Sequence, residues 1–389
     1  MNYNFDMIID RRNTRSDKWD SYPPDILPMW IADSDFRCPQ PVIDAVTETA
    51  RRGIFGYTRP DGAFERAYAG WMSERFGWRV APDWVRWCPS IGTALAVCIR
   101  AFTLPGDSVC MLLPTYPPFL NLCGLNGRTV AGSVLHEKNG HYTIDFDNLE
   151  NTLAHPRTKL LLLCNPHNPT GRAFSLQELQ QIGEMCLRHG VMVFSDEIHC
   201  DIVYKGRHIP FSTLSPELSA ITLVGINASK TFNLADLRSA AVISSNETLL
   251  ALFTEECNRS KLGRCSLGIA GVIAAYTECA DYADQLLVYL RGNMEFAVEY
   301  FASHIPAVKT YMPDATFMLW LDCRATGMRQ DELQDFFLSK AKVALNSGDS
   351  FGEGGHGFMR INLACPRATV AEGLNRISNA FAGSTMRKM

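Results

Sequence analysis

Five short apolar runs in the middle of the chain constrain its fold more than any other feature. The runs are apolar on both faces and bounded by residues such as Gly, Pro or Asp, which is typical of strands buried beneath helices. Helix-period segments separate them, so the repetition predicts an α/β fold with a mostly parallel sheet and right-handed crossovers. The runs are Ser108–Leu113, Lys159–Cys164, Val191–Ser195, Ile221–Gly225 and Ser239–Ser244.

One helix between these runs carries clear start and stop signals. Ser175 and Glu178 have the spacing of a capping box, in which each side chain accepts from an otherwise unpaired amide. Gly190 supplies a C-cap, so we expect the helix to end there. The residues predicted to share its apolar face are Leu176, Leu179, Ile182 and Met185.

The 389 residues are long enough for two or three domains at about 150 residues each. The alternating strands and helices predict a large unit over residues 45–285. Residues 286–389 predict a smaller unit, and the proline-rich residues 1–44 predict an irregular segment that packs with it. In the smaller unit we expect helices over Asp284–His304 and Gln330–Lys342, and strands over Phe317–Leu321 and Gly357–Asn362.

Charge and cysteine usage limit the partners and the compartment. Lys and Arg number 37 against 41 Asp and Glu, a net charge of −4, which disfavours a nucleic-acid-binding protein. The 13 cysteines include no C-x-x-C pair and lie in apolar runs, as small buried hydrophobes do in a reducing cytosol. No signal peptide and no apolar run near the ~18 residues of a membrane span is visible. We therefore expect a soluble, cytoplasmic protein with no membrane partner.

Lys230 is the first candidate for chemistry, because it directly follows the run Ile221–Gly225 in the segment Ala228-Ser-Lys-Thr-Phe232. A lysine amine forms a Schiff base with an aldehyde and so acts as a covalent catalyst. Taken alone, the pattern also fits a solvated loop lysine.

Asp196 ends the neighbouring run Val191–Ser195, and ligands of open α/β sheets bind beyond the carboxyl ends of strands. A carboxylate there keeps a heterocyclic nitrogen protonated. The same aspartate also fits a helix N-cap. A metal site is a third interpretation, but strand alternation places its members on different faces, and we predict no metal. Its members would be Asp196, Glu197, His199 and Asp201.

Two further segments complete a candidate ligand site. Asn168 lies in a turn with two prolines and a glycine, and its amide can donate to a phenolate oxygen, although turn formation alone explains the pattern. Ser90 and Gly92 open a helix and Arg238 follows Lys230, a combination that suits phosphate, although such helix starts are common. An aldehyde anchor, a pyridinium partner, a phenolate donor and a phosphate site together predict pyridoxal 5′-phosphate.

On these segments the chain resembles the fold type I (aspartate-aminotransferase-like) superfamily of pyridoxal-phosphate enzymes. More closely, it is similar to the MalY/PatB-type carbon–sulfur lyases, the cystathionine β-lyase branch. The resemblance implies a large domain with a mostly parallel mixed sheet between helices, plus a smaller α+β domain. The motifs that carry it are Met29-Trp-Ile-Ala-Asp-Ser-Asp-Phe36, Phe55-Gly-Tyr57, Pro114-Thr-Tyr116-Pro-Pro-Phe119, Leu163-Cys-Asn-Pro-His-Asn168-Pro-Thr-Gly-Arg172, Ser195-Asp-Glu-Ile-His199, Ser229-Lys-Thr-Phe-Asn-Leu234 and Gly357-Phe-Met-Arg360-Ile-Asn-Leu-Ala-Cys-Pro-Arg367.

The resemblance also implies a role for each candidate residue. Lys230 would hold the cofactor covalently, and Asp196 would pair with the pyridinium nitrogen. Asn168 and His199 would contact the 3′-oxygen, and Tyr116 would stack on the ring. The residues implied to surround the phosphate are Ser90, Ile91, Gly92, Asn227, Ser229 and Arg238.

The substrate and the assembly follow from the same resemblance. Arg360 would bind the α-carboxylate of a small amino-acid substrate with both branches of its guanidinium, with Ala32 and Asn168 beside it. Tyr57 would reach the cofactor phosphate of the neighbouring subunit, which implies a homodimer with shared active sites.

The implied reaction is β-elimination from L-cystathionine or a related cysteine S-conjugate, giving a thiol, pyruvate and ammonia. Lys230 would be the general base, with Asp196 and Tyr116 as the other catalytic residues. The residues do not by themselves exclude a pyridoxal-phosphate-dependent aminotransferase acting on an L-amino acid and a 2-oxo acid. Arg238 favours that alternative, because it matches the phosphate arginine of ordinary aminotransferases.

Overall fold

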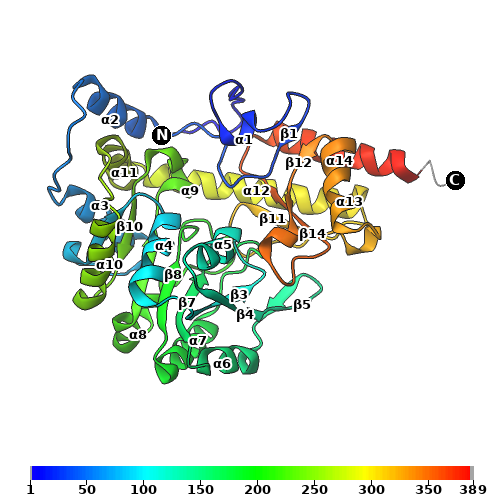
Figure 1. The fold of residues 1–389 in the computed structure, drawn as a ribbon. Helices are drawn as coiled ribbons and strands as arrows, with labels where there is room; N and C mark the ends of the chain where they lie inside the picture. Colours follow the sequence, from blue (N-terminus) through cyan, green and yellow to red (C-terminus); the bar gives the residue numbers. More distant parts are fainter. Residues whose placement is uncertain (1, 386–389) are drawn as a thin grey trace.

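A seven-stranded sheet in the lower half of Figure 1 contains all five predicted strands. The computed structural model describes residues 2–385. The sequence did not predict the two outer strands, β2 (Val85–Cys88) and β4 (Thr129–Val134), whose side chains are less uniformly buried. The strands are, in spatial order, β2 (Val85–Cys88), β10 (Ala240–Ile243), β9 (Thr222–Ile226), β8 (Met192–Asp196), β7 (Thr158–Cys164), β3 (Ser108–Leu113) and β4 (Thr129–Val134).

The sheet is mostly parallel, as predicted. Only β10 runs opposite to its neighbours, β2 and β9, and the remaining pairs are parallel. Ala240 at the start of β10 therefore lies beside Cys88 at the end of β2, and Ala241 lies beside Ile226 at the end of β9. The start of β10 thus shares an edge with the carboxyl ends of the other strands.

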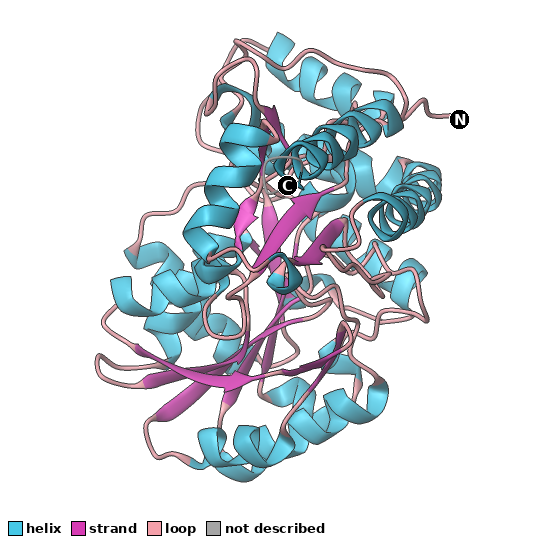
Figure 2. Ribbon diagram, turned by 90° about the vertical axis from the view of Figure 1, so that its right-hand side faces the viewer, coloured by secondary structure: helices cyan, strands magenta, loops and turns pink. Residues whose placement is uncertain are grey.

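Both faces of the sheet are covered by helices, which explains why the strand sequences are continuously apolar (Figure 2). In β7, Leu160 and Leu162 face α4 (Ile91–Phe102), α5 (Pro117–Leu125) and α10 (Glu247–Arg259). Leu161 and Leu163 face α6 (Phe146–Ala154) and α7 (Leu176–His189). Towards β9 and β10 the second face is covered by α3 (Ala63–Phe76) and α11 (Ser266–Glu278). Alternate buried residues of a strand therefore contribute to cores on opposite faces of the sheet.

The helices are α1 (Asp17–Asp20), α2 (Gln40–Arg51), α3 (Ala63–Phe76), α4 (Ile91–Phe102), α5 (Pro117–Leu125), α6 (Phe146–Ala154), α7 (Leu176–His189), α8 (Pro216–Ala220), α9 (Ser229–Phe232), α10 (Glu247–Arg259), α11 (Ser266–Glu278), α12 (Ala280–His304), α13 (Gln330–Asp335) and α14 (Arg367–Thr385). Among residues 2–385, none of them has the length and hydrophobicity that crossing a bilayer requires.

Helix α7 begins and ends as predicted. Ser175 and Glu178 form both hydrogen bonds of the capping box, and Gly190 adopts the left-handed conformation of a C-cap. The predicted apolar face was wrong at one position, because Leu176 is exposed and Gly183 and Cys186 are buried instead. Leu176 is the first residue of α7, where its side chain is exposed to solvent.

A second, smaller sheet lies above the large one in Figure 2 and is formed by β11 (Met318–Asp322), β14 (Phe358–Asn362) and β13 (Asn346–Ser347), in that order. β11 and β14 confirm the strands predicted near Phe317–Leu321 and Gly357–Asn362. The predicted helix over Gln330–Lys342 is α13 followed by a π-helical turn, Phe336–Lys340. Helix α12 starts before the boundary predicted at residues 285 and 286, and the division into units stays a prediction.

The N-terminal segment is more regular than its prolines predicted. It contains α1 and a short strand, β1 (Leu27–Pro28), which pairs in parallel with β12 (Val343–Ala344). Leu27 and Met29 donate to carbonyls of residues 342 and 344, so Pro28 lies where no donor is needed. Helix α2 begins at Gln40, within the residues predicted to be irregular. A two-stranded ribbon, β5 (His136–Lys138) and β6 (His141–Thr143), completes the strands of the described residues.

Candidate active site

The strand order brings most of the predicted site residues to one edge of the large sheet. β2, β9, β8, β7 and β3 all end at this edge, and β10 begins there. Each candidate from these elements lies within a few residues of a strand end. Across the sheet they are Ser90 after β2, Arg238 before β10, Asn227 and Lys230 after β9, Asp196 and His199 at the end of β8, Asn168 after β7 and Tyr116 after β3.

The residues predicted to hold phosphate lie around the start of α4 and the turn after β9. Ser90 is the N-cap of α4, and its Oγ accepts a hydrogen bond from the amide of Thr93 at 3.1 Å. Ile91 and Gly92 form the first turn, where amides have no acceptor within the helix. These amides and the positive helix end suit an anion.

Two further residues predicted to surround the phosphate lie next to the neighbouring strands β9 and β10. The Oδ1 atom of buried Asn227 accepts from the amide of Ser229 at 2.9 Å, which fixes the turn into α9. Arg238 is exposed and has a φ of 49°, immediately before β10. Gly225 in β9 lets α4 approach the sheet, because a Cβ there would lie 2.7 Å from Phe194 and 3.2 Å from Ile91.

Lys230 lies in α9, a single turn that follows β9. Its Nζ donates to the carbonyl oxygen of Ala32 at 2.5 Å. Burial and, to a smaller extent, the nearby Arg360 guanidinium lower the lysine pKa to about 8, against the opposite effects of Asp33 and Asp196. The amine is therefore largely neutral in mildly alkaline solution, which is the form that attacks an aldehyde.

Asp196 and His199 are buried beside it. Burial raises the Asp196 pKa to about 7, although its Oδ1 accepts from the Ile198 amide at 3.1 Å. The Nδ1 atom of His199 is buried and has no hydrogen-bond partner, and burial lowers the His199 pKa well below its ordinary value. The buried Asp196 carboxyl needs a cation, and the buried His199 imidazole lacks a hydrogen-bond partner. A polar heterocyclic ligand would satisfy both groups.

Arg360 reaches the same place from β14. Its guanidinium donates to Asn168 Oδ1 at 3.0 Å, Asn346 Oδ1 at 2.6 Å and the Trp30 carbonyl at 3.0 Å. Its Nε has no partner, and burial lowers the Arg360 pKa to about 10. All of these partners are neutral oxygens, so the buried cation is ready for a carboxylate.

Tyr116 caps the start of α5 and is half-buried. Burial raises the pKa of its phenol, and both Arg360 and Asp196 are close enough to influence it. The phenol therefore lies within electrostatic range of both charged groups, and the stacking of Tyr116 on a cofactor ring stays a prediction.

The sequence did not predict two of the contacts that Arg360 makes. Asn346 and the Trp30 carbonyl were not predicted, because their contact with Arg360 depends on long-range pairing of β13 and the N-terminal segment. Tyr57, which was predicted to serve the neighbouring subunit, is fully exposed in the loop between α2 and α3, and its role stays a prediction.

The argument against a metal site assumed that residues 196–201 continue a strand, with side chains alternating between its faces. This assumption was wrong, because β8 ends at Asp196 and a turn follows. The carboxylates of Glu197 and Asp201 nevertheless bind different partners. Glu197 accepts from His208, with 2.7 Å between Oε2 and Nε2, and Asp201 accepts from Trp71 and Thr231.

Comparison with known proteins identifies the family. The model of aminotransferase class I and II matches residues 25–377. The chain belongs to this family. A curated member, the cystathionine beta-lyase PatB of Bacillus subtilis (strain 168), is 42% identical over 97% of this chain and 100% of its own length. Both the family resemblance and its α/β fold are thus confirmed.

Solved structures of the family agree. Cystalysin from Treponema denticola, which contains pyridoxal 5′-phosphate, superposes with a TM-score of 0.95 at 31% identity, covering 98% of this chain and 100% of cystalysin. The PLP-bound C–S lyase from Staphylococcus hominis has a TM-score of 0.92 at 30% identity, covering 98% of both chains. The aspartate-aminotransferase-like arrangement of both sheets is therefore shared with cofactor-containing family members.

We expect Lys230 in the cofactor-free protein to react with an amine-directed acylating reagent with a midpoint near pH 8. Burial favours the neutral amine, so labelling should rise from pH 6 and level off above about 9. Peptide mass spectrometry after labelling measures this, with the exposed Lys205 as an internal control. A Lys230 midpoint near the ordinary 10.5 would contradict the described burial.

Proposed function

We propose that this protein is a pyridoxal-phosphate-dependent carbon–sulfur β-lyase that acts on L-cystathionine or a related cysteine S-conjugate. The single observation that carries the proposal is the convergence of Lys230, Asp196 and Arg360 at one sheet edge. The full-length similarity to a cystathionine beta-lyase and to a C–S lyase supports the reaction class.

The residues present fit the cofactor. Lys230 would hold its aldehyde carbon, Asp196 would face the ring nitrogen, and the unpartnered His199 would join Asn168 at the 3′-oxygen. Tyr116 would cover the ring. Around the phosphate we place Ser90, Ile91, Gly92, Asn227, Ser229 and Arg238.

When bound, pyridoxal 5′-phosphate supplies an electron sink for negative charge that develops at the substrate Cα. Asp196 would remain ionised opposite the ring nitrogen, because a nearby cation opposes the rise in its pKa that burial causes. A negative Asp196 keeps the nitrogen protonated, which favours carbanion formation at the substrate.

Arg360 would bind the substrate α-carboxylate. Its guanidinium is held by neutral oxygens of Asn168, Asn346 and Trp30, so a carboxylate adds the first full negative charge among these contacts. A substrate held in this way would have its Cα within reach of Lys230, which lies near Arg360. Once its amine is free, Lys230 can take the Cα proton, since its pKa of about 8 suits a general base.

The overall reaction consumes water and breaks the Cβ–S bond. Cystathionine and one water give homocysteine, pyruvate and ammonia, with the electron pair of the broken bond leaving on sulfur. The alternative function is that of an aminotransferase. The residue that favours it is Arg238, which matches the phosphate-binding arginine of ordinary aminotransferases. We place this function second, because a phosphate-binding arginine is compatible with both reactions.

We expect the purified holoenzyme to release free thiol and pyruvate from L-cystathionine without any added 2-oxo acid. Ellman's reagent and lactate dehydrogenase measure the two products. Lys230→Ala should lower the rate by about 10³-fold or more, since it removes the general base.

Two controls separate the alternatives. Addition of a 2-oxo acid should leave the rate unchanged. Turnover that requires the oxo acid and forms a new amino acid would overturn the lyase proposal in favour of the aminotransferase.

We also propose that the protein is a cytoplasmic homodimer with shared sites. The loop between α2 and α3 exposes Ile54, Phe55 and Tyr57, with Ile54 83% and Phe55 65% accessible. Exposed apolar side chains grouped in one loop are typical of an interface. The 13 cysteines, all free, support a reducing compartment.

Light scattering should therefore give about twice the chain mass of 43.4 kDa. Tyr57→Phe should keep this mass and weaken cofactor binding by about 10-fold, because only the phosphate contact is lost. A fully active monomer would overturn the shared-site proposal, and Tyr57→Phe with unchanged cofactor affinity would overturn the role of its hydroxyl.

A further inference from the structure

One short backbone segment touches both cations of the proposed active site. The carbonyl of Trp30 accepts from Arg360 Nη2 at 3.0 Å, and the carbonyl of Ala32 accepts from Lys230 Nζ at 2.5 Å. These two contacts join β14 of the small sheet and α9 after the large sheet through two residues of the N-terminal segment. The position of this backbone therefore affects the base and the carboxylate-binding group together.

The side chain of Asn362 also binds this backbone segment. It lies two residues after Arg360 on β14, and its Nδ2 donates to the carbonyls of Ile31 at 2.7 Å and Asp33 at 2.6 Å. Its Oδ1 accepts from the Ala364 amide at 2.8 Å, and the side chain is buried. Both amide hydrogens of one buried side chain are thus used to fix the carbonyls on either side of Ala32.

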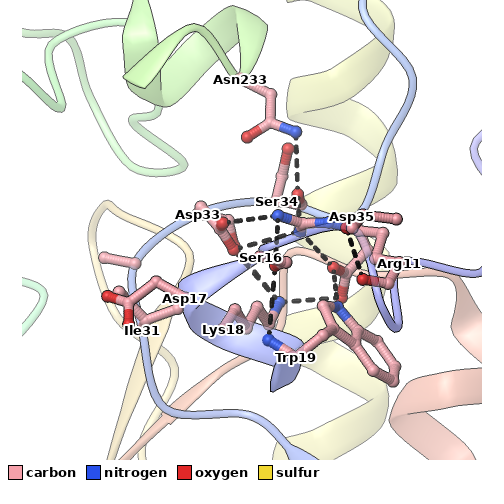
Figure 3. Close-up of polar contacts among 12 residues, drawn as sticks. Arg11, Ser16, Asp17, Lys18, Trp19, Ile31, Asp33, Ser34, Asp35 and Asn233 are labelled. Atoms are coloured by element: carbon pink, nitrogen blue, oxygen red, sulfur yellow. Dashed lines mark hydrogen bonds and ion pairs between the residues drawn. The ribbon is translucent and has the colours of Figure 1, made fainter. Parts of the chain in front are cut away.

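A buried charge cluster supports the next residues (Figure 3). Lys18 is 1% exposed, and its Nζ lies 2.8 Å from Asp35 and donates to the carbonyl of Asp33. Arg11 pairs with Asp33 at 2.8 Å and Asp35 at 2.6 Å. Because buried charges must stay paired, the cluster opposes any shift of residues 33–35.

The segment is also tied to the lysine helix itself. Asn233, the C-cap of α9, donates from Nδ2 to the Ser34 carbonyl at 2.9 Å (Figure 3). Residues 30–35 are therefore held from β14, from α9 and from the charge cluster at once. Such support is expected of a backbone that must not move while a substrate binds.

We infer that residues 30–35 form a positioning segment that holds Lys230 and Arg360 in register, and that Asn362 is its principal positioning residue. The inference rests on the proposed function, because it takes Lys230 as the base and Arg360 as the carboxylate site. Asn362 touches neither reacting group and acts through the Ala32 and Trp30 carbonyls.

The consequences for Lys230 follow from its surroundings. The charged and titratable groups near it are Asp196, Asp33, Arg360 and His199. The Asp33 carboxylate and the Ala32 carbonyl both favour a protonated nitrogen, so a displaced segment lowers the pKa of that nitrogen.

The test compares Asn362→Ala with Asn293→Ala in the holoenzyme. Asn293 is an equally buried asparagine whose Nδ2 donates to two carbonyls, those of Leu363 and Cys365, each at 2.9 Å, but it does not contact the segment. Asn293 Oδ1 also accepts from Arg367 Nε at 2.8 Å, so each variant loses three side-chain hydrogen bonds. Only Asn362→Ala should move the pH midpoint of the absorbance band of the lysine-bound cofactor, downward by about half a unit or more.

Activity gives a second readout. Asn362→Ala should lower kcat/KM for cystathionine by about 10- to 100-fold with changes in both kcat and KM, because both functional cations shift. Asn293→Ala should stay within about threefold of the wild type at a comparable loss of Tm. An unchanged midpoint in Asn362→Ala, or equal effects in both variants, would overturn the inference and leave a structural role.

If Asn362→Ala does not fold, Asp33→Asn tests the positioning role of residues 30–35 instead. It preserves side-chain volume at a partly exposed position and should also lower the absorbance midpoint, whereas an unchanged midpoint would overturn the inference. Failure of the proposed function is separate. A wild type that releases no thiol would end the lyase proposal, while the absorbance comparison would still decide the role of the segment.

Discussion

The burial of two cations, Lys230 and Arg360, at the edge of a parallel sheet is the constraint on which the rest of the site depends. Both pKa values fall, and that of the equally buried Asp196 rises, because each charge has left water without a full counter-charge in contact. Neutral oxygens satisfy the guanidinium instead. A cofactor with a cationic ring nitrogen and a substrate with a carboxylate supply the missing charges, so each binding event stabilises the ionised form of a buried group.

The sheet topology makes this concentration of groups possible. Reversal of β10 between β2 and β9 leaves their carboxyl ends on the common edge and places the start of β10, with Arg238, beside them. The small sheet then supplies Arg360 and Asn346 from the opposite side. The proposed site therefore lies between elements far apart in sequence, and the N-terminal segment connects the two sides.

The sequence predicted those parts of the site that follow from local rules. Lys230, Asp196 and Asn168 each follow an apolar strand, and the position of a strand end can be read from the sequence pattern. The contacts of Asn346, Asn362 and Lys18 could not be predicted, since they depend on pairing between residues distant in the chain. The roles of the cofactor residues came from the family resemblance rather than from spacing.

The central claim is that Lys230 is the residue to which the cofactor is bound at this edge. Borohydride reduction of the purified holoenzyme, followed by proteolysis and mass spectrometry, measures it directly, because reduction makes a lysine–cofactor bond permanent. The account predicts the reduced pyridoxal phosphate group on Lys230 alone. A modified lysine elsewhere in the chain, or a protein that retains the cofactor with no reducible bond, would contradict it.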